Sequence, residues 1–223
     1  RSHGMLQSGA RYAVTETSFA AECYNERNII SKIFPKAVEL IGGLFISLPN
    51  DPEDYPEKFL KGCKIAKIPT KEIEISEVLK HEKELTKNIL RAFHVPDALI
   101  YPTKLFYLLA KEIRAYGGKI LTNHKVVSIK QINNIVSSVV VSHNGVKKNI
   151  ECDGIINAAG PWSSKIAKLI NQNVELQLTR GCGIFFAGQL VSQAINRCRI
   201  PNNNDIMCPS GKESLWGTTS EVV

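Results

Sequence analysis

The feature that most constrains this sequence is an apolar run that enters a glycine turn and then a helix, within DGIINAAGPWSSKIAKLIN (residues 153–171). The run predicts a buried strand, Gly160 turns the chain, and Pro161 begins the helix. A strand, turn and helix in this order present backbone N–H groups to an anion. We therefore expect an α/β chain with Ala159 and Gly160 beside a phosphate or ribose; a turn packed tightly for steric reasons alone is the alternative.

Hydrophobic periodicity predicts further helices and strands on both sides of this motif. One helix is expected over residues 17–34. The pattern changes at Ala98 and predicts another helix that ends at Gly117-Gly118, with its inward face formed by Leu105, Leu108, Leu109 and Ile113. Runs of β-branched residues between 124 and 156 predict strands separated by turns at Asn133-Asn134 and Asn144-Gly145. Further strands are expected in GLFISLP, QLTRGCGIFFAG, DIMCPS and ESLWGTTS.

Composition excludes several classes of protein. The 223 residues carry a net charge of +7, but the lysines are scattered, so no nucleic-acid groove is expected. Six cysteines without C-x-x-C or zinc spacing predict reduced thiols and no metal site. No apolar stretch reaches the roughly 18 residues of a membrane span, so we expect a cytoplasmic protein that reaches a membrane only through a partner.

The opening segment RSHGMLQSGARYAV is the first candidate site. Its small residues let the backbone pass close to a bulky ligand, and Arg11 and Tyr12 add a fixed cation and a phenol. A frayed terminal loop is the alternative interpretation. A later cluster places Arg180, Arg197 and Arg199 near small residues, where they either meet an anion or lie on the surface as strand-end arginines.

Four motifs follow one another along the chain: HGMLQSGARYAV, INAAGPWS, INRCRIP and GTTS. In their order and spacing, the sequence resembles the FAD-dependent glycerol-3-phosphate dehydrogenases. The resemblance is strongest to the catalytic A subunits of the anaerobic enzymes, within the amino-acid-oxidase-like flavoproteins. It implies a partial FAD-binding domain from residues 1–40 and 98–175. It also implies a substrate or cap domain from residues 41–97 and 176–223, with a mixed, largely antiparallel sheet.

The same resemblance implies roles for individual residues. Substrate contacts are expected from Arg11, Tyr12, Arg180 and Thr218, the last within the turn from Gly217 to Thr219. Cofactor contacts are expected from Ser2, His3, Gly4, Met5, Val126, Ala159 and Gly160.

Two departures from the family pattern leave the catalytic base unnamed. Gln7 stands where close relatives carry histidine, and Gly183 stands where the aerobic branch carries a histidine proposed as base. The sequence also has no G-x-G-x-x-G, so it lacks the loop that cradles a dinucleotide. We therefore expect a piece of a longer polypeptide without the N-terminal βαβ unit, which purifies colourless.

The expected reaction of the full-length protein is FAD-dependent oxidation of sn-glycerol 3-phosphate to dihydroxyacetone phosphate. Two alternatives remain: oxidation of a hydroxy acid or amino acid, with Arg11 holding a carboxylate, and a non-catalytic assembly module. Expected partners are the small phosphorylated substrate and an electron-acceptor subunit or quinone pathway. An exposed sheet edge also suggests pairing with a second copy.

Overall fold

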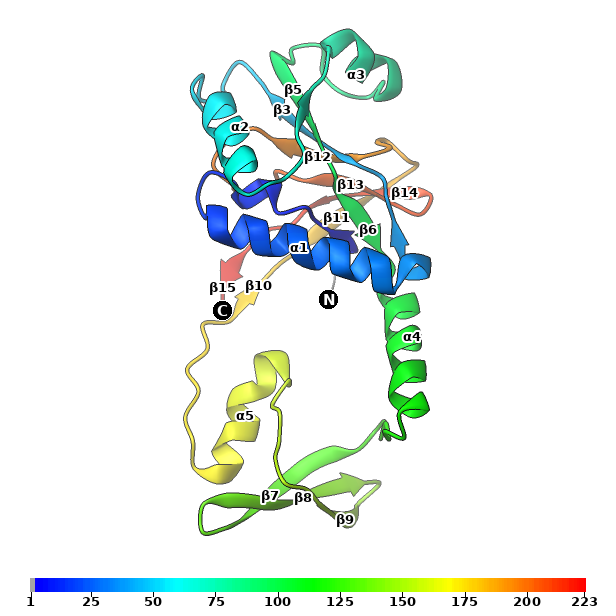
Figure 1. The fold of residues 1–223 in the computed structure, drawn as a ribbon, viewed down its shortest axis with the longest axis vertical. Helices are drawn as coiled ribbons and strands as arrows, with labels where there is room; N and C mark the ends of the chain where they lie inside the picture. The colour runs from blue at the N-terminus through cyan, green and yellow to red at the C-terminus, as the bar shows by residue number, and fades with distance from the viewer. Residues whose placement is uncertain (1–2) are drawn as a thin grey trace. The chain divides into compact units, whose positions relative to one another are not determined.

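The computed structural model describes residues 3–223 and divides the chain into two compact units (Figure 1). The first unit comprises Arg1–Glu112 and Gly181–Ser220, and the second comprises Ile113–Arg180 and Glu221–Val223. Ser2, an expected cofactor contact, lies outside the described residues. The assignment of segments to a flavin-binding and a substrate domain stays a prediction, because this division concerns compactness alone.

A seven-stranded sheet forms the centre of the first unit, in the order β11-β14-β13-β12-β3-β5-β4. Neighbouring strands are antiparallel except for the parallel pair β12–β3, so the expected mixed, largely antiparallel sheet is confirmed. The strands are β3 (Gly43–Ser47), β4 (Lys71–Glu72), β5 (Arg91–Val95), β11 (Gly183–Ala187), β12 (Ala194–Arg197), β13 (Met207–Ser210) and β14 (Glu213–Gly217).

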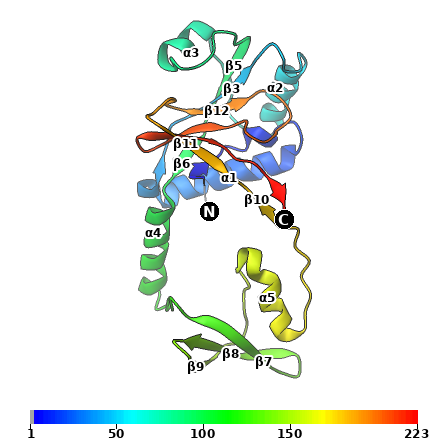
Figure 2. The same ribbon diagram turned by 180° about the vertical axis from the view of Figure 1, so that it is seen from behind.

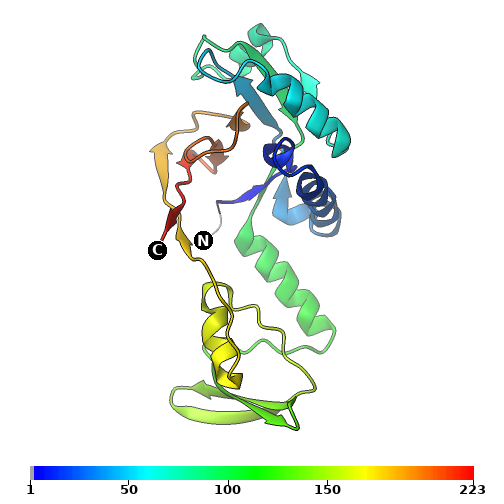
Figure 3. The ribbon, with the colours of Figure 1, turned by 90° about the vertical axis from the view of Figure 1, so that its left-hand side faces the viewer.

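Both faces of the sheet's centre are covered, which explains why every residue of β3 is buried. On one face Phe45 pairs with Phe93 across the strands, and both contact Phe59 of the helix α2 (Tyr55–Ile65). The helix α1 (Thr17–Ile33) packs beside α2 on this face (Figure 3). On the other face Leu44 packs with residues that include Val78 of α3 (Ile75–His81). Successive side chains of β3 point to opposite faces of the sheet, so they contribute to two separate apolar cores.

A small sheet, in the order β1-β6-β2, places the opening segment. The strand β1 (Met5–Leu6) pairs with β6 (Ala98–Ile100), which also pairs with β2 (Val38–Glu39). Two 3-10 turns, η1 (Ala10–Tyr12) and η2 (Pro35–Ala37), precede and follow α1. This sheet therefore fixes where the chain enters η1.

The second unit contains a meander of β7 (Lys125–Ile132), β8 (Ile135–His143) and β9 (Val146–Glu151) (Figure 2). Positive φ angles at Asn133, Asn134, Asn144 and Gly145 give the two expected tight turns, which are confirmed. The unit continues through η3 (Gly160–Trp162), α5 (Ser163–Ala167) and η4 (Lys168–Ile170), and β10 (Thr179–Arg180) pairs with β15 (Glu221–Val222).

Two expectations for this half of the chain are wrong. Residues 155–158 form no strand, and Ile156 is 94% exposed, although the sequence predicted a buried strand there. A strand requires at least one neighbouring strand to pair with its backbone, and among the described residues no strand pairs with this segment. The helix α4 (Pro102–Ala115) is present, but none of its residues is fully buried: Leu105 and Leu108 are half-buried, and Leu109 and Ile113 are exposed.

The described residues also bear on the composition arguments. All six cysteines are free. No helix within residues 3–223 is both long enough and apolar enough to cross a bilayer.

Candidate active site

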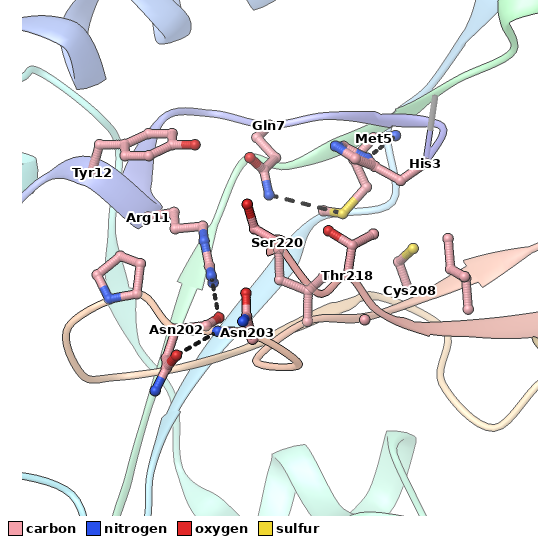
Figure 4. A pocket seen from close by; sticks show the side chains of 14 residues that line it. His3, Met5, Gln7, Arg11, Tyr12, Asn202, Asn203, Cys208, Thr218 and Ser220 are labelled. Atoms are coloured by element: carbon pink, nitrogen blue, oxygen red, sulfur yellow. Dashed lines mark hydrogen bonds between the residues drawn. The ribbon is translucent and has the colours of Figure 1, made fainter. Parts of the chain in front are cut away.

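A hollow of about 380 Å³ in the first unit is the candidate active site (Figure 4). A hollow of this size suits a small ligand. Two parts of the chain that are distant in sequence form its wall: the opening segment, and the region from the loop between β12 and β13 to the residues just after β14. The lining residues are His3, Met5, Gln7, Arg11, Tyr12, Pro201, Asn202, Asn203, Ile206, Cys208, Leu215, Gly217, Thr218 and Ser220.

A buried carboxylate holds the opening segment in place. Asp97 Oδ1 accepts hydrogen bonds from the backbone N–H and the hydroxyl of Ser8, each at 2.7 Å. Burial raises the pKa of Asp97, and these two bonds oppose that rise because they favour the charged form. The segment that carries Arg11 is therefore anchored to the turn between β5 and β6.

Gly9 is the position at which this segment requires glycine. Its φ is +85°, and a Cβ there would lie 2.3 Å from the carbonyl oxygen of Ala20 in α1. Only glycine allows both this conformation and so close an approach of two backbones. The approach brings η1, with Arg11 and Tyr12, directly against α1.

Arg11 supplies the positive charge of the hollow. Its Nη2 donates to the carbonyl oxygen of Asn202 at 2.8 Å, which connects the opening segment to the loop between β12 and β13. Burial lowers the pKa of Arg11 and the nearby Asp205 carboxylate opposes this shift; an arginine nevertheless stays protonated at neutral pH. Within residues 3–223, no carboxylate lies within ion-pair distance of Arg11.

The loop between β12 and β13 is organised by Asp205. The side chain of Asp205 is 2% exposed and accepts hydrogen bonds from Arg199 Nη2 and from the backbone N–H of Asn202. The next strand is tied to the same loop, because the indole N–H of Trp216 donates to the carbonyl of Asn204 at 2.9 Å. The backbone N–H of Asn204 also donates to the carbonyl of Thr218 at 3.3 Å.

The structure brings together five of the residues predicted from the sequence. Arg11, Tyr12 and Thr218, which are predicted substrate contacts, line the hollow, and so do His3 and Met5, which are predicted cofactor contacts; these roles stay predictions. Gly4 lies between the last two. His3 Nδ1 accepts from the backbone N–H of Met5 at 3.1 Å, and burial lowers the pKa of His3.

The other predicted residues are not part of this hollow. Val126, Ala159, Gly160 and Arg180 belong to the second unit, and their roles stay predictions. Arg180 lies on β10 and forms an exposed ion pair with Glu221 at 3.3 Å.

Two further arginines have structural partners. Arg197 pairs with the fully buried carboxylate of Asp51 at 2.6 Å, and Arg199 pairs with Asp205. Their guanidinium groups therefore hold the chain together and do not serve as open anion sites.

Sequence reasoning missed the wall formed by Asn202 and Asn203 and the carboxylates Asp97 and Asp205 behind it. The run PNNND between two predicted strands signals a turn, because asparagine and aspartate hydrogen-bond to nearby backbone groups. That signal gives a loop but does not show which ligand the loop faces.

Two of the predicted cofactor contacts are glycines with a positive φ and room beside the backbone, which is compatible with a bulky ligand at each. Gly4 has a φ of +74°, and the atom nearest its Cβ position is Ile100 O at 3.5 Å, an ordinary van der Waals distance. At Gly160, with a φ of +54°, nothing lies within 4 Å of the Cβ position, which leaves room for a phosphate or ribose against the backbone. Each glycine leaves room beside its backbone within its own unit, and the cofactor roles of Gly4 and Gly160 stay predictions.

Comparison with known protein families gives the class of protein to which this sheet and hollow belong. The family model for FAD dependent oxidoreductases matches residues 1–222, and the chain belongs to this family. FAD is therefore its cofactor.

Within this family, the chain is similar to subunits of anaerobic glycerol-3-phosphate dehydrogenases. The chain is 33% identical, over 234 residues, to the A1 subunit of the anaerobic glycerol-3-phosphate dehydrogenase of Haloferax volcanii. It is 32% identical, over 222 residues, to the A subunit of the Escherichia coli K12 enzyme. These matches cover 100% and 99% of this chain but only 40% and 41% of the relatives, so the chain spans about two fifths of their length.

Solved structures show the same fold at lower identity. The L-alpha-glycerophosphate oxidase from Mycoplasma pneumoniae matches with a TM-score of 0.78 at 18% identity, covering 99% of this chain and 61% of that protein. The glycerol-3-phosphate dehydrogenase from Bacillus halodurans matches with a TM-score of 0.69 at 18% identity, covering 100% and 40%. Glycine oxidase from Geobacillus kaustophilus matches with a TM-score of 0.72 at 12% identity, covering 99% and 60%.

Proposed function

We propose that the full-length protein carrying this chain oxidises sn-glycerol 3-phosphate to dihydroxyacetone phosphate. The names of the curated relatives support this substrate. The structural observation that carries it is Arg11, a partly buried cation in a small hollow, with no carboxylate in ion-pair contact among residues 3–223. Such a guanidinium suits a substrate phosphate, because it offers two parallel N–H donors to two phosphate oxygens.

The chain's residues bind and orient this substrate. Arg11 holds the phosphate, while Thr218 and Asn203 line the hollow with hydrogen-bonding groups for the hydroxyls. The phenol of Tyr12 lies beside Arg11, its ring held edge-on against Phe19 at a centroid distance of 5.1 Å. When bound, FAD supplies the acceptor for the hydride that leaves C2 of the alcohol.

Flavin reduction tests this substrate directly. The FAD-loaded full-length enzyme is mixed anaerobically with sn-glycerol 3-phosphate, glycerol, glycine or a 2-hydroxy acid, and the bleaching of the flavin absorbance is followed. We expect reduction by sn-glycerol 3-phosphate and none by glycerol, which lacks the phosphate. Reduction by glycine or the hydroxy acid, but not by the phosphate ester, would replace this proposal with carboxylate recognition by Arg11.

A second part of the proposal concerns the partner. The relatives are named as subunits, and we propose that this protein also passes electrons to another subunit, through which it reaches the membrane. Affinity purification of the tagged full-length protein from its own cells, followed by mass spectrometry and membrane fractionation, tests this. Recovery of the active protein alone, in the soluble fraction only, would contradict it.

A further inference from the structure

The loop that closes one side of the hollow depends on a carboxylate outside the hollow. Asp205 is absent from the lining, yet its two oxygens accept from Arg199 Nη2 and from the backbone N–H of Asn202, the latter at 2.8 Å. Its side chain is 2% exposed, so these contacts are screened little by water. Asp205 therefore fixes the position of Asn202.

The position of Asn202 in turn affects Arg11. The carbonyl oxygen of Asn202 accepts from Arg11 Nη2 at 2.8 Å, and this is the hydrogen bond the structure gives between the guanidinium and the loop. A guanidinium is planar, so one fixed donor restricts the plane in which its other N–H groups lie. The chain of contacts from Asp205 through Asn202 thus orients the donors that Arg11 presents to the hollow.

Charge supports the same connection. Burial lowers the pKa of Arg11 most, the nearby positive charge of Arg199 lowers it further, and the Asp205 carboxylate raises it. Asp205 forms its ion pair with Arg199. One of the two positive charges is thereby neutralised, and the charge of Arg11 is left for an anion in the hollow.

We propose that Asp205 is a positioning residue for phosphate recognition: through the backbone of Asn202 it sets the orientation of Arg11 and hence the affinity for the substrate phosphate. This inference rests on the proposed function. Asp205 touches neither the hollow nor a reacting atom, so removing its charge should change substrate affinity and leave the chemical step nearly unaltered.

A matched control for a merely structural role exists in the same unit. Glu82 is also a buried carboxylate that pins a loop, accepting from the backbone N–H groups of Ser192 and Gln193 at 2.9 and 3.2 Å. It does not line the hollow. Glu82→Gln should therefore destabilise the fold without altering substrate affinity.

The experiment compares Asp205→Asn, Glu82→Gln and the unaltered FAD-loaded full-length enzyme by melting temperature, KM and kcat. For Asp205→Asn we expect KM for sn-glycerol 3-phosphate to rise about tenfold, the size of one charge-assisted hydrogen bond, with kcat within about twofold. Glu82→Gln is expected to lower the melting temperature with KM unchanged. Asp205→Glu, which keeps the charge, is the second variant should the neutral one fail to fold, and a smaller rise in KM is expected.

A double variant shows whether Asp205 acts through Arg11. In the Arg11→Met background, Asp205→Asn should raise KM no further, because the group it orients is gone. Equal effects in both backgrounds, or an Asp205→Asn enzyme with a lowered melting temperature and unaltered KM, would overturn the proposal.

Binding of inorganic phosphate tests the role of Asp205 independently of the proposed substrate. If the unaltered enzyme is not reduced by sn-glycerol 3-phosphate, the proposed function fails, but calorimetric titration with phosphate still tests Asp205. Weaker phosphate binding in Asp205→Asn than in Glu82→Gln supports positioning, and equal or undetectable binding in all three proteins refutes it.

Discussion

Replacing Gly9 by alanine is expected to disrupt the attachment of η1, with Arg11 and Tyr12, to α1. A residue other than glycine in the left-handed conformation costs about 1–2 kcal/mol. The added Cβ would also lie 2.3 Å from Ala20 O, a backbone atom, and such overpacking costs about 1–3 kcal/mol more. We therefore expect Gly9→Ala to lower the free energy of unfolding by about 3–4 kcal/mol.

Gly211 provides the matched control. It lies in the same unit, in the turn between β13 and β14, with a φ of +66° and nothing within 4 Å of its Cβ position. Gly211→Ala incurs only the conformational cost, about 1–2 kcal/mol. The difference between the two variants thus isolates the steric clash with α1.

Urea denaturation followed by circular dichroism measures both variants on the same chain. At about 2–4 °C per kcal/mol for a unit of this size, thermal melting should show a drop of about 10 °C for Gly9→Ala and about 4 °C for Gly211→Ala. Equal losses in the two variants would refute the reasoning, because they would mean that the backbones at Gly9 and Ala20 do not approach as closely as the structure has them.

Three further predictions concern single side chains. Arg11→Lys should raise KM for sn-glycerol 3-phosphate about tenfold, because lysine cannot form the two parallel hydrogen bonds of a guanidinium. Arg197→Lys is the control and should leave KM unchanged, because Arg197 pairs with Asp51 outside the hollow. Steady-state kinetics measures both variants. Glu82→Gln should cost about 2 kcal/mol of stability in urea denaturation, because the charge that accepts from Ser192 and Gln193 is lost, and an unchanged midpoint would contradict this. Because burial raises the pKa of Asp97 in the folded state, ionisation of Asp97 destabilises the fold once the pH exceeds the unfolded-state pKa near 4. The stability of Asp97→Asn relative to the unaltered chain should therefore increase as the pH rises from about 4 through the folded-state pKa. Parallel curves of unfolding free energy against pH for the two proteins would disprove this.

Local chemistry let the sequence predict most of the individual elements. Pro35 ends the helix α1, and the asparagine and glycine pairs form the turns between β7, β8 and β9. These effects extend over only a few residues and need no tertiary contact. The family motifs likewise identified Arg11, Tyr12 and Thr218, which the structure places in one hollow.

Tertiary contacts decided the rest. The residues 155–158 carry a strand-like sequence, but a parallel strand exists only where neighbouring strands accept and donate its backbone hydrogen bonds. The assignment of Asp97 and Asp205 to the support of the hollow also required coordinates, because Ser8 lies 89 residues from Asp97 and Arg11 lies 191 residues from Asn202.

The sequence by itself thus determined which short segments become helices, strands and turns, and which motifs point to a flavin and an anion. The tertiary structure alone decided which arginine stays available. Arg197 and Arg199 are paired with buried carboxylates, whereas Arg11 donates to a carbonyl oxygen and has no ion pair within residues 3–223. Pairings between residues distant in the chain cannot be read from a local sequence pattern.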